Sequence, residues 1–165
     1  MAQTHSLPPI PRALSHAPGM IRVSDPLLRR LLRYGVPMGP NQVVVMRGRV
    51  SGRELEVPLA IMEFRGRRYV MGTFGEVNWV RNLRAAQRAE IRVAGKPQEP
   101  VRAVELTDDD GVAFYGETFA EYTRAMSAPM RLFARVFLGI FAPEMLSDPA
   151  LAAQKHPVFE LRAAD

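Results

Sequence analysis

Hydrophobic and polar positions alternate with a short period through the first half of the chain. Three segments rich in Val, Ile and Tyr follow one another between residues 42 and 72, and they read QVVVMRGRV, ELEVPLAIMEF and RRYVMG. The polar turns SGR and RGR separate them, which predicts strands joined as two consecutive antiparallel hairpins. Pro58 cannot donate to a sheet ladder, so its strand is predicted to lie at an edge or to carry a bulge.

Later segments add strands and the first helices. AEIRVAG and EPVRAVEL predict another hairpin, and HPVFEL near the C-terminus predicts a final strand. Residues 24–34, SDPLLRRLLRY, place leucines on one side and arginines on the other, which predicts a short basic amphipathic helix. We expect its apolar side to pack on the core, with contact to a membrane surface as the alternative. Asn78 is predicted to cap a helix that continues through Ala86.

The region after Thr107 is predicted to be helical. Thr107 and the aspartates that follow it form a helix start with acidic residues in the first turn. Tyr115, Phe119 and Tyr122 recur at helical spacing and are predicted to share a face. A dense apolar segment, MRLFARVFLGIFAPEML, comes next and is predicted to be interrupted at Gly139 and Pro143.

These elements predict an α+β fold in which a small, mostly antiparallel barrel or sheet is flanked by helices. A chain of 165 residues is most simply one domain. We expect residues 1–23 to form a flexible leader and residues 24–165 to form that domain. No run of about 20 apolar residues is present, so no segment is expected to span a bilayer, and the leader does not have the pattern of a secretory signal.

The composition excludes several kinds of chemistry. Cysteine is absent, which removes disulfides and thiolate nucleophiles and is compatible with the cytoplasm. The histidines His5, His16 and His156 are scattered, so no metal site is expected. No nucleophile elbow, Walker loop or dinucleotide fingerprint is present. If the protein is an enzyme, a bound organic cofactor is expected to supply the reactivity.

The charge is strongly biased toward arginine. The chain carries 20 Arg against 2 Lys and a formal net charge of +5. This balance favours an anionic ligand, a nucleic acid or an acidic membrane surface, although a coding preference for arginine would give the same count. The arginines are spread over hairpins and helices without a reading motif, so we expect no nucleic-acid partner.

Two stretches carry candidate chemistry. RGRVSGRELEVPL places Arg47, Arg49 and Arg53 around a Ser51–Gly52 turn, and such a turn is either an anion cradle or a solvated basic hairpin. FGEVNWVRNLR contains the only tryptophan, whose indole offers a flat face for stacking on a heteroaromatic ring. The amides of Asn78 and Asn82 in this stretch either order the backbone or bind ring carbonyls. The stretch is therefore a packed corner or the wall of a ligand site.

Taken together, the GR-x-SG hairpin that leads into VPL, the strand that ends in YVMGTFG and the segment NWVRNLRA resemble the deazaflavin-dependent nitroreductase family. Members of this family are split β-barrel proteins related in fold to FMN-binding split-barrel oxidoreductases. The resemblance runs from about Pro26 to Leu106, with a looser similarity in HPVFEL. It implies coenzyme F420, a 5-deazaflavin with a phosphate and an oligoglutamate tail. It also implies an F420H2-dependent reductase that transfers a hydride to a quinone, an enone or a nitroaromatic compound.

The resemblance also implies roles for individual residues. Arg47, Arg49, Ser51 and Gly52 would lie by the phosphate and the tail, with Arg53 as a further cation, and Pro58 and Leu59 would line the ring pocket. Gly72, Thr73, Phe74 and Gly75 would allow the backbone to approach the cofactor. Asn78, Trp79 and Asn82 would close the site, unless Trp79 packs beneath it. Tyr115 or Tyr122 would donate a proton.

A second hypothesis remains open. Val50 and Leu55 occupy positions at which the family commonly has cations, and the apolar segment Met130–Phe141 could cover a pocket or rest on a membrane. The chain would then be a non-catalytic split-barrel protein that binds FMN, haem, a lipid or no cofactor. In either case we expect a small-molecule ligand, a monomer or homodimer, and a cytoplasmic location with possible peripheral contact to the inner membrane.

Overall fold

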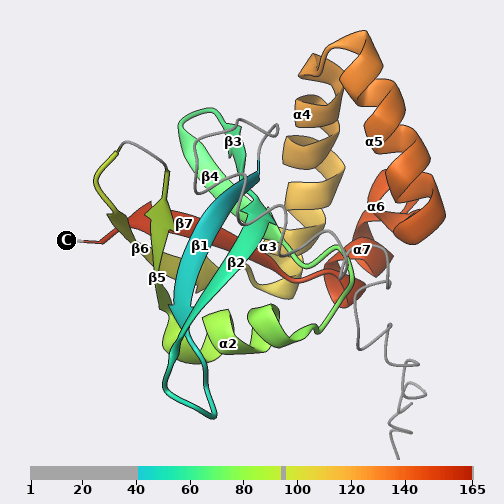
Figure 1. Ribbon diagram of the computed structural model, residues 1–165. Coiled ribbons are helices and arrows are strands. Elements are labelled where there is room, and N and C mark those ends of the chain that lie inside the picture. The colour runs from blue at the N-terminus through green and yellow to red at the C-terminus, as the bar shows by residue number, and fades with distance from the viewer. Residues whose placement is uncertain (1–40, 94–95, 165) are drawn as a thin grey trace, which may run out of the picture.

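The computed structural model describes residues 41–93 and 96–164, which form a seven-stranded sheet with helices against it (Figure 1). The predicted leader and the predicted helix 24–34 lie outside the described residues, so the domain boundary at residue 24 stays a prediction. The sheet order is β2-β1-β5-β6-β7-β4-β3, and every neighbouring pair is antiparallel. The strands are β1 (Asn41–Arg47), β2 (Glu54–Ala60), β3 (Met62–Phe64), β4 (Arg67–Met71), β5 (Arg88–Arg92), β6 (Glu99–Glu105) and β7 (Val158–Ala163).

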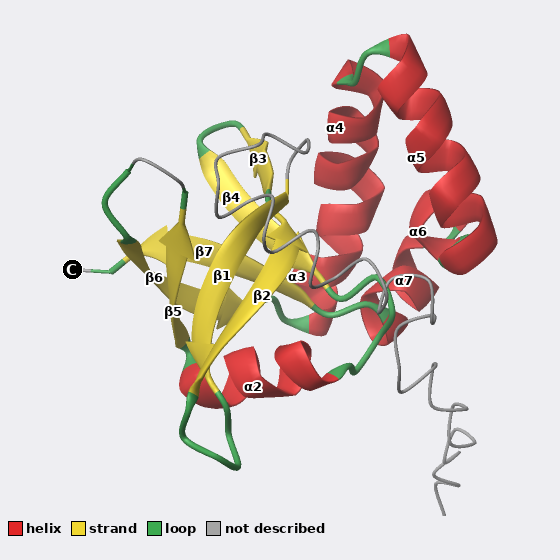
Figure 2. Ribbon diagram, in the orientation of Figure 1, coloured by secondary structure: helices red, strands yellow, loops and turns green. Residues whose placement is uncertain are grey.

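The predicted hairpins and the last strand are confirmed, and so is the edge position of the strand that contains Pro58. The segment ELEVPLAIMEF, however, divides at Ile61 into two strands at opposite edges of the sheet. Because β2 and β3 are consecutive in the chain, the sheet has to curl until its two edges approach each other. Figure 2 shows the resulting curved sheet, which confirms the predicted α+β split-barrel fold.

Two hydrophobic clusters flank the last strands. The barrel cluster contains Val70 and Phe159, whereas the helix cluster contains their chain neighbours Tyr69 and Val158. Successive strand residues point to opposite faces, so β4 and β7 bury both faces. This explains why the first four residues of β7, residues 158–161, are all buried.

The helices are α2 (Asn78–Ala86), α3 (Asp108–Ala113), the π-helical turn η1 (Phe114–Phe119), α4 (Ala120–Ala125), α5 (Ala128–Phe141), α6 (Glu144–Ser147) and α7 (Pro149–Lys155). Helix α2 closes one end of the barrel, and α4 and α5 form a pair that extends beyond the sheet (Figure 1). The predicted start at Thr107 is confirmed, since its hydroxyl oxygen accepts from the Asp110 N–H at 3.2 Å. The predicted break at Gly139 is wrong, because α5 continues through it to Phe141.

Candidate functional site

The bend between β1 and β2 is ordered by its own hydrogen bonds. The Gly48 N–H donates to the Arg53 carbonyl and the Gly52 N–H to the Gly48 carbonyl, each at 2.8 Å. Gly52 has a φ of +64°, a conformation that favours glycine. The Ser51 hydroxyl oxygen accepts from the Arg53 N–H at 3.3 Å, so this side chain helps to shape the turn.

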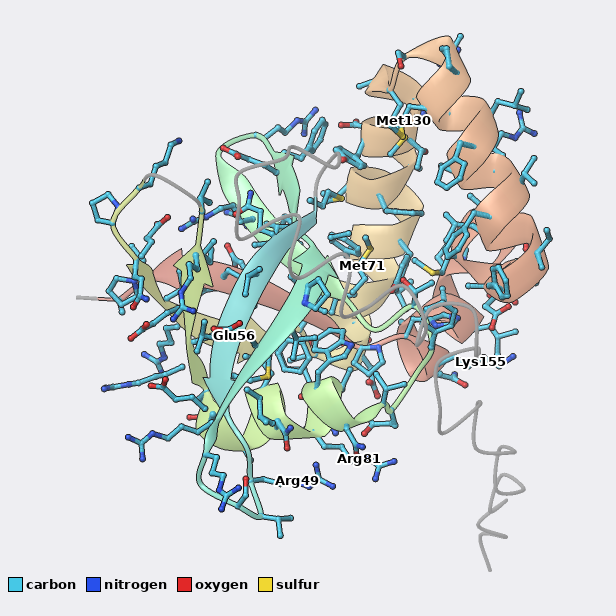
Figure 3. The ribbon with its side chains drawn as sticks, in the orientation of Figure 1. Arg49, Glu56, Met71, Arg81, Met130 and Lys155 are labelled. Atoms are coloured by element: carbon cyan, nitrogen blue, oxygen red, sulfur yellow. The ribbon has the colours of Figure 1, made fainter. Side chains whose placement is uncertain are left out.

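The bend contacts helix α2 through one buried amide. The Oδ1 atom of Asn82 accepts from the Arg49 backbone N–H at 3.3 Å and from Arg49 Nη1 at 2.8 Å. Asn82 is 6% exposed. Figure 3 shows Arg49 at the bend, below α2. The structure therefore brings together the two stretches that the sequence singled out, and Asn82 orders the backbone of the bend.

The charges around the bend leave a surplus of guanidinium donors. Within the described residues, Arg47 and Arg53 are exposed and have no ion-pair partner. Glu56 on β2 pairs with Arg92 on β5, which compensates its negative charge. Val50, at the tip of the bend, is 88% exposed. The chemistry of this donor set fits an anion, because charge-assisted hydrogen bonds to phosphate and carboxylate are the strongest that arginine makes.

The chain enters α2 through a tight glycine corner, residues 72–75. The Gly72 N–H donates to the Pro157 carbonyl at 2.8 Å, and the Gly75 N–H donates to the Gly72 carbonyl at 2.7 Å. Gly75 has a φ of +73°. The predicted cap at Asn78 is wrong. Val77 is the extended N-cap residue and Asn78 is the first helical residue, so the helix begins one residue earlier than predicted.

Gly72 is required by packing. A Cβ atom at this position would lie 3.1 Å from the Gly75 carbonyl oxygen, 3.1 Å from Val80 Cγ2 and 3.2 Å from Pro157 Cδ. We predict that Gly72→Ala lowers the free energy of unfolding by about 1–3 kcal/mol, because two of these neighbours are parts of a rigid turn and a ring. Urea denaturation measures the change. Gly66→Ala is a comparison for strain alone, since that position has a positive φ and no atom within 4 Å of the added carbon.

His156 connects the glycine corner to the C-terminal helices, and sequence reasoning missed it. Its Nδ1 lies 3.2 Å from the Gly72 carbonyl oxygen, and its Nε2 lies 3.1 Å from a carboxylate oxygen of Glu144. The ring is 3% exposed. The ring therefore bridges the Gly72 carbonyl and the Glu144 carboxylate. The only signal in the sequence was its position directly before the last strand.

Trp79 and Leu59 pack in the barrel cluster, whereas Pro58 is the neighbour of Leu59 on strand β2 and is not part of that cluster. Trp79 is half-buried against the barrel cluster, with its ring centroid 6.4 Å from that of Phe159. Leu59 is buried in the same cluster, and Pro58 is half-buried on the edge strand. Trp79 therefore has a packing role in the barrel. Stacking of its indole on a ligand stays a prediction.

The arginines of α2 are engaged by carboxylates and carbonyls. Arg84 donates to both Glu76 and Glu105, with its closest Nη2–oxygen distances at 2.6 Å, and Arg81 Nε donates to the Glu76 carbonyl at 3.0 Å. The hydrogen bond from Arg84 holds the pKa of Glu76 below its usual value. These arginines fix α2 to its surroundings, so the anion-binding capacity of the site belongs to the bend.

The two tyrosines predicted as proton donors lie in the helix cluster, apart from the barrel cluster that contacts Trp79. The Tyr115 hydroxyl donates to the His156 carbonyl at 2.9 Å, and burial raises its pKa well above the usual value. Tyr122 is half-buried with its ring 6.0 Å from that of Phe64, and burial raises its pKa as well. A cavity of about 450 Å³ between η1, α4 and α5 is lined in part by Tyr115.

Comparison with known proteins identifies one family. The model of the F420H2-dependent quinone reductases matches residues 31–131, which is more than half of the chain. A search of curated proteins found no significant match. Within the described residues, no cluster of three or more His, Cys, Asp or Glu side chains could hold a metal ion.

Several solved structures are similar to this chain at low sequence identity. A candidate 5-nitroimidazole antibiotic resistance protein from Bacteroides thetaiotaomicron is 10% identical, with 82% of this chain and 80% of that chain covered and a TM-score of 0.50. An F420-H2 dependent reductase is 19% identical over 74% of this chain and 94% of its own, with a TM-score of 0.43. An FAD-binding protein from Mesorhizobium loti is 15% identical, with coverages of 81% and 88% and a TM-score of 0.43.

Proposed function

Because the chain belongs to the F420H2-dependent quinone reductase family, we propose that it transfers a hydride from reduced coenzyme F420 to a quinone. The family assignment confirms the resemblance to deazaflavin-dependent split-barrel proteins. It also gives the coarser function, an F420H2-dependent reductase with F420 as cofactor. The choice of a quinone over an enone or a nitroaromatic compound is the proposed part. The observation that supports the site most directly is the contact between Arg49 and Asn82.

The residues at the bend fit the anionic part of F420. Arg47 and Arg53 offer guanidiniums that have no carboxylate partner among the described residues, and we assign them to the phosphate and the oligoglutamate tail. Arg49 is held by Asn82, so it contributes a fixed charge with donors to spare. Ser51 and Gly52 shape the turn that presents them. The pairing of Glu56 with Arg92 reduces the repulsion that its carboxylate would exert on a polyanion.

When bound, the reduced deazaflavin supplies the hydride. The protein's part would be to hold the flat ring against apolar side chains, for which we assign Pro58, Leu59 and Trp79, and to exclude water there. Reduction of a quinone takes up one hydride and one proton to give the hydroquinone. Of the two predicted proton donors, we favour Tyr122, because the hydroxyl of Tyr115 already donates to the His156 carbonyl. Tyr122→Phe is expected to slow turnover at unchanged F420 affinity, measured by steady-state kinetics.

The location of the reaction is part of the proposal. We expect a cytoplasmic protein that works at the inner surface of the membrane, because quinones with long apolar tails dissolve in lipid. Within the described residues, no helix is both long enough and apolar enough to cross a bilayer. Contact with the membrane would therefore have to be peripheral for this part of the chain.

Two measurements test the function. Titration of the purified protein with F420, followed by fluorescence, is expected to show saturable binding, and absence of binding at tens of micromolar would remove the proposal. Oxidation of F420H2 is then compared with a short-chain quinone, an enone and a nitroaromatic acceptor, and the quinone is expected to be the best substrate. A flavin or haem spectrum in the natively purified protein would instead favour the non-catalytic alternative.

A further inference from the structure

Helix α5 is apolar on two opposite faces, although only one of them packs against the protein. Leu138 is 7% exposed and belongs to the helix cluster. On the opposite side lies the outer stripe, which we define as Leu132, Phe133, Val136 and Ile140. These side chains are 65%, 64%, 55% and 68% exposed. A helix that is apolar all round is normally buried, so the outer stripe calls for a partner.

The geometry of α5 gives the stripe a continuous surface. Leu132, Val136 and Ile140 recur every four residues and therefore stack along one side of the helix. Figure 1 shows α5 at the margin of the molecule, with α4 and α6 between it and the sheet. Scattered exposed leucines need no explanation, but a contiguous apolar strip on one helix marks an interaction surface.

The charge beside the stripe indicates which kind of partner fits. Helix α5 contains Arg131 and Arg135 and no acidic residue. Arg135 is exposed and has no ion-pair or hydrogen-bond partner within the described residues, whereas Arg131 donates to the Arg124 carbonyl at 2.9 Å. Both arginines line the cavity between η1, α4 and α5, and only Arg135 is also exposed beside the stripe. An arginine at the edge of an apolar stripe can extend along it and place its guanidinium among lipid phosphates.

We propose that α5 is an interfacial helix whose outer stripe docks on an anionic lipid bilayer. A second copy of the chain matches less well, because it would bring another Arg135 to the contact and α5 offers no acidic residue to pair with it. An anionic bilayer offers an apolar interior for the stripe and phosphates for Arg135.

The same helix touches the candidate active site, and this step rests on the proposed function. The ring of Phe74, in the glycine corner, lies edge-on to Phe137 at 6.3 Å and to Phe141 at 5.9 Å. Docking through α5 would therefore place the glycine corner beside the membrane. A lipid-dissolved quinone could then reach the site without crossing water.

Vesicle flotation with the full-length protein tests the docking. The vesicles contain phosphatidylcholine alone or with about one third phosphatidylglycerol, and we expect binding to the anionic vesicles that weakens as salt is raised. Val136→Ser with Ile140→Ser is expected to weaken this binding at least about tenfold. Arg135→Gln is expected to weaken it about fivefold and to leave binding to neutral vesicles unchanged.

Matched controls separate docking from general effects. Val112→Ser removes a 39% exposed valine from α3, and Arg102→Gln removes an exposed charge from β6; both should bind vesicles like the parent. Equal binding by the parent and the stripe variant, or no binding by the parent, would overturn the proposal. So would a dimer in size-exclusion chromatography that only the stripe variant loses. F420 titration in vesicle-free buffer is the separate readout, since its failure would remove the proposed function and leave the docking result standing.

Discussion

Replacing Arg47 and Arg53 together by glutamine is expected to weaken F420 binding about a hundredfold without unfolding the protein. Both side chains are exposed and lack ion-pair partners in the described part of the chain, so their loss removes no contact within the fold. A charge-assisted hydrogen bond contributes roughly 1.5–3 kcal/mol. Solvent screening at an exposed bend favours the lower end of that range. Two such bonds then correspond to about two orders of magnitude, measured by fluorescence titration at fixed ionic strength.

The matched control is Arg88→Gln with Arg102→Gln, which removes the same formal charge from exposed positions on β5 and β6. This variant should bind F420 within about twofold of the parent, because long-range attraction is screened beyond roughly 8–10 Å. An equal loss in both variants would show that the net charge, rather than the bend, attracts the cofactor. That result would contradict the assignment of the bend as the anion site.

Local patterns in the sequence were sufficient for most of the sheet. The alternation of apolar and polar residues and the turns SGR and RGR predicted the hairpins, and Pro58 predicted the edge strand. The division at Ile61 was missed because Leu59, Ile61 and Met62 are all apolar. Buried and exposed residues alternate from Leu59 to Ile61. The next residue, Met62, is buried as well, but it lies in the helix cluster whereas Ile61 lies in the barrel cluster. Which cluster a side chain enters depends on the curl of the sheet, and no local pattern encodes it.

The sequence stretches that form the site could be predicted, but the side-chain contacts between them could not. The arginine bend and the α2 stretch were both identified, yet the acceptor for Arg49 lies 33 residues away at Asn82, and nothing local connects the two. Arg92 and Glu56 are a similar case, since their strands meet only through β1. The cap at Asn78 was misplaced because the helix begins one residue earlier, after Val77, whose side chain has no oxygen that would mark it as a cap.

Replacing His156 by alanine is expected to lower the free energy of unfolding by about 2–4 kcal/mol. The change removes two hydrogen bonds, leaves the Gly72 carbonyl without its ring partner and opens a cavity in a site where the ring is 3% exposed. Urea denaturation at neutral pH measures the loss. Lys155→Ala is the control, because it removes another partner of Glu144 and leaves the buried ring in place. An equal loss in the two variants would assign the stability to the charge on Glu144 rather than to His156.

The dependence of the melting temperature on pH in the acid range tests the hydrogen bonds between Glu144, Lys155 and His156 independently. Burial alone would raise the pKa of Glu144, but hydrogen bonds from its own backbone N–H, Lys155 and His156 outweigh burial and hold the pKa below its usual value. Because the folded-state pKa is lowered, the ionised carboxylate stabilises the protein above the unfolded-state pKa, and this contribution is lost as the pH falls through the folded-state pKa.

Glu144→Gln should therefore flatten the dependence of the melting temperature on pH in the acid range. His156→Ala should flatten it in part, because one of the three opposing hydrogen bonds is gone. Glu76 and Glu99, whose pKa values are lowered by hydrogen bonds from Arg84 and Arg68, keep the remaining slope in both variants.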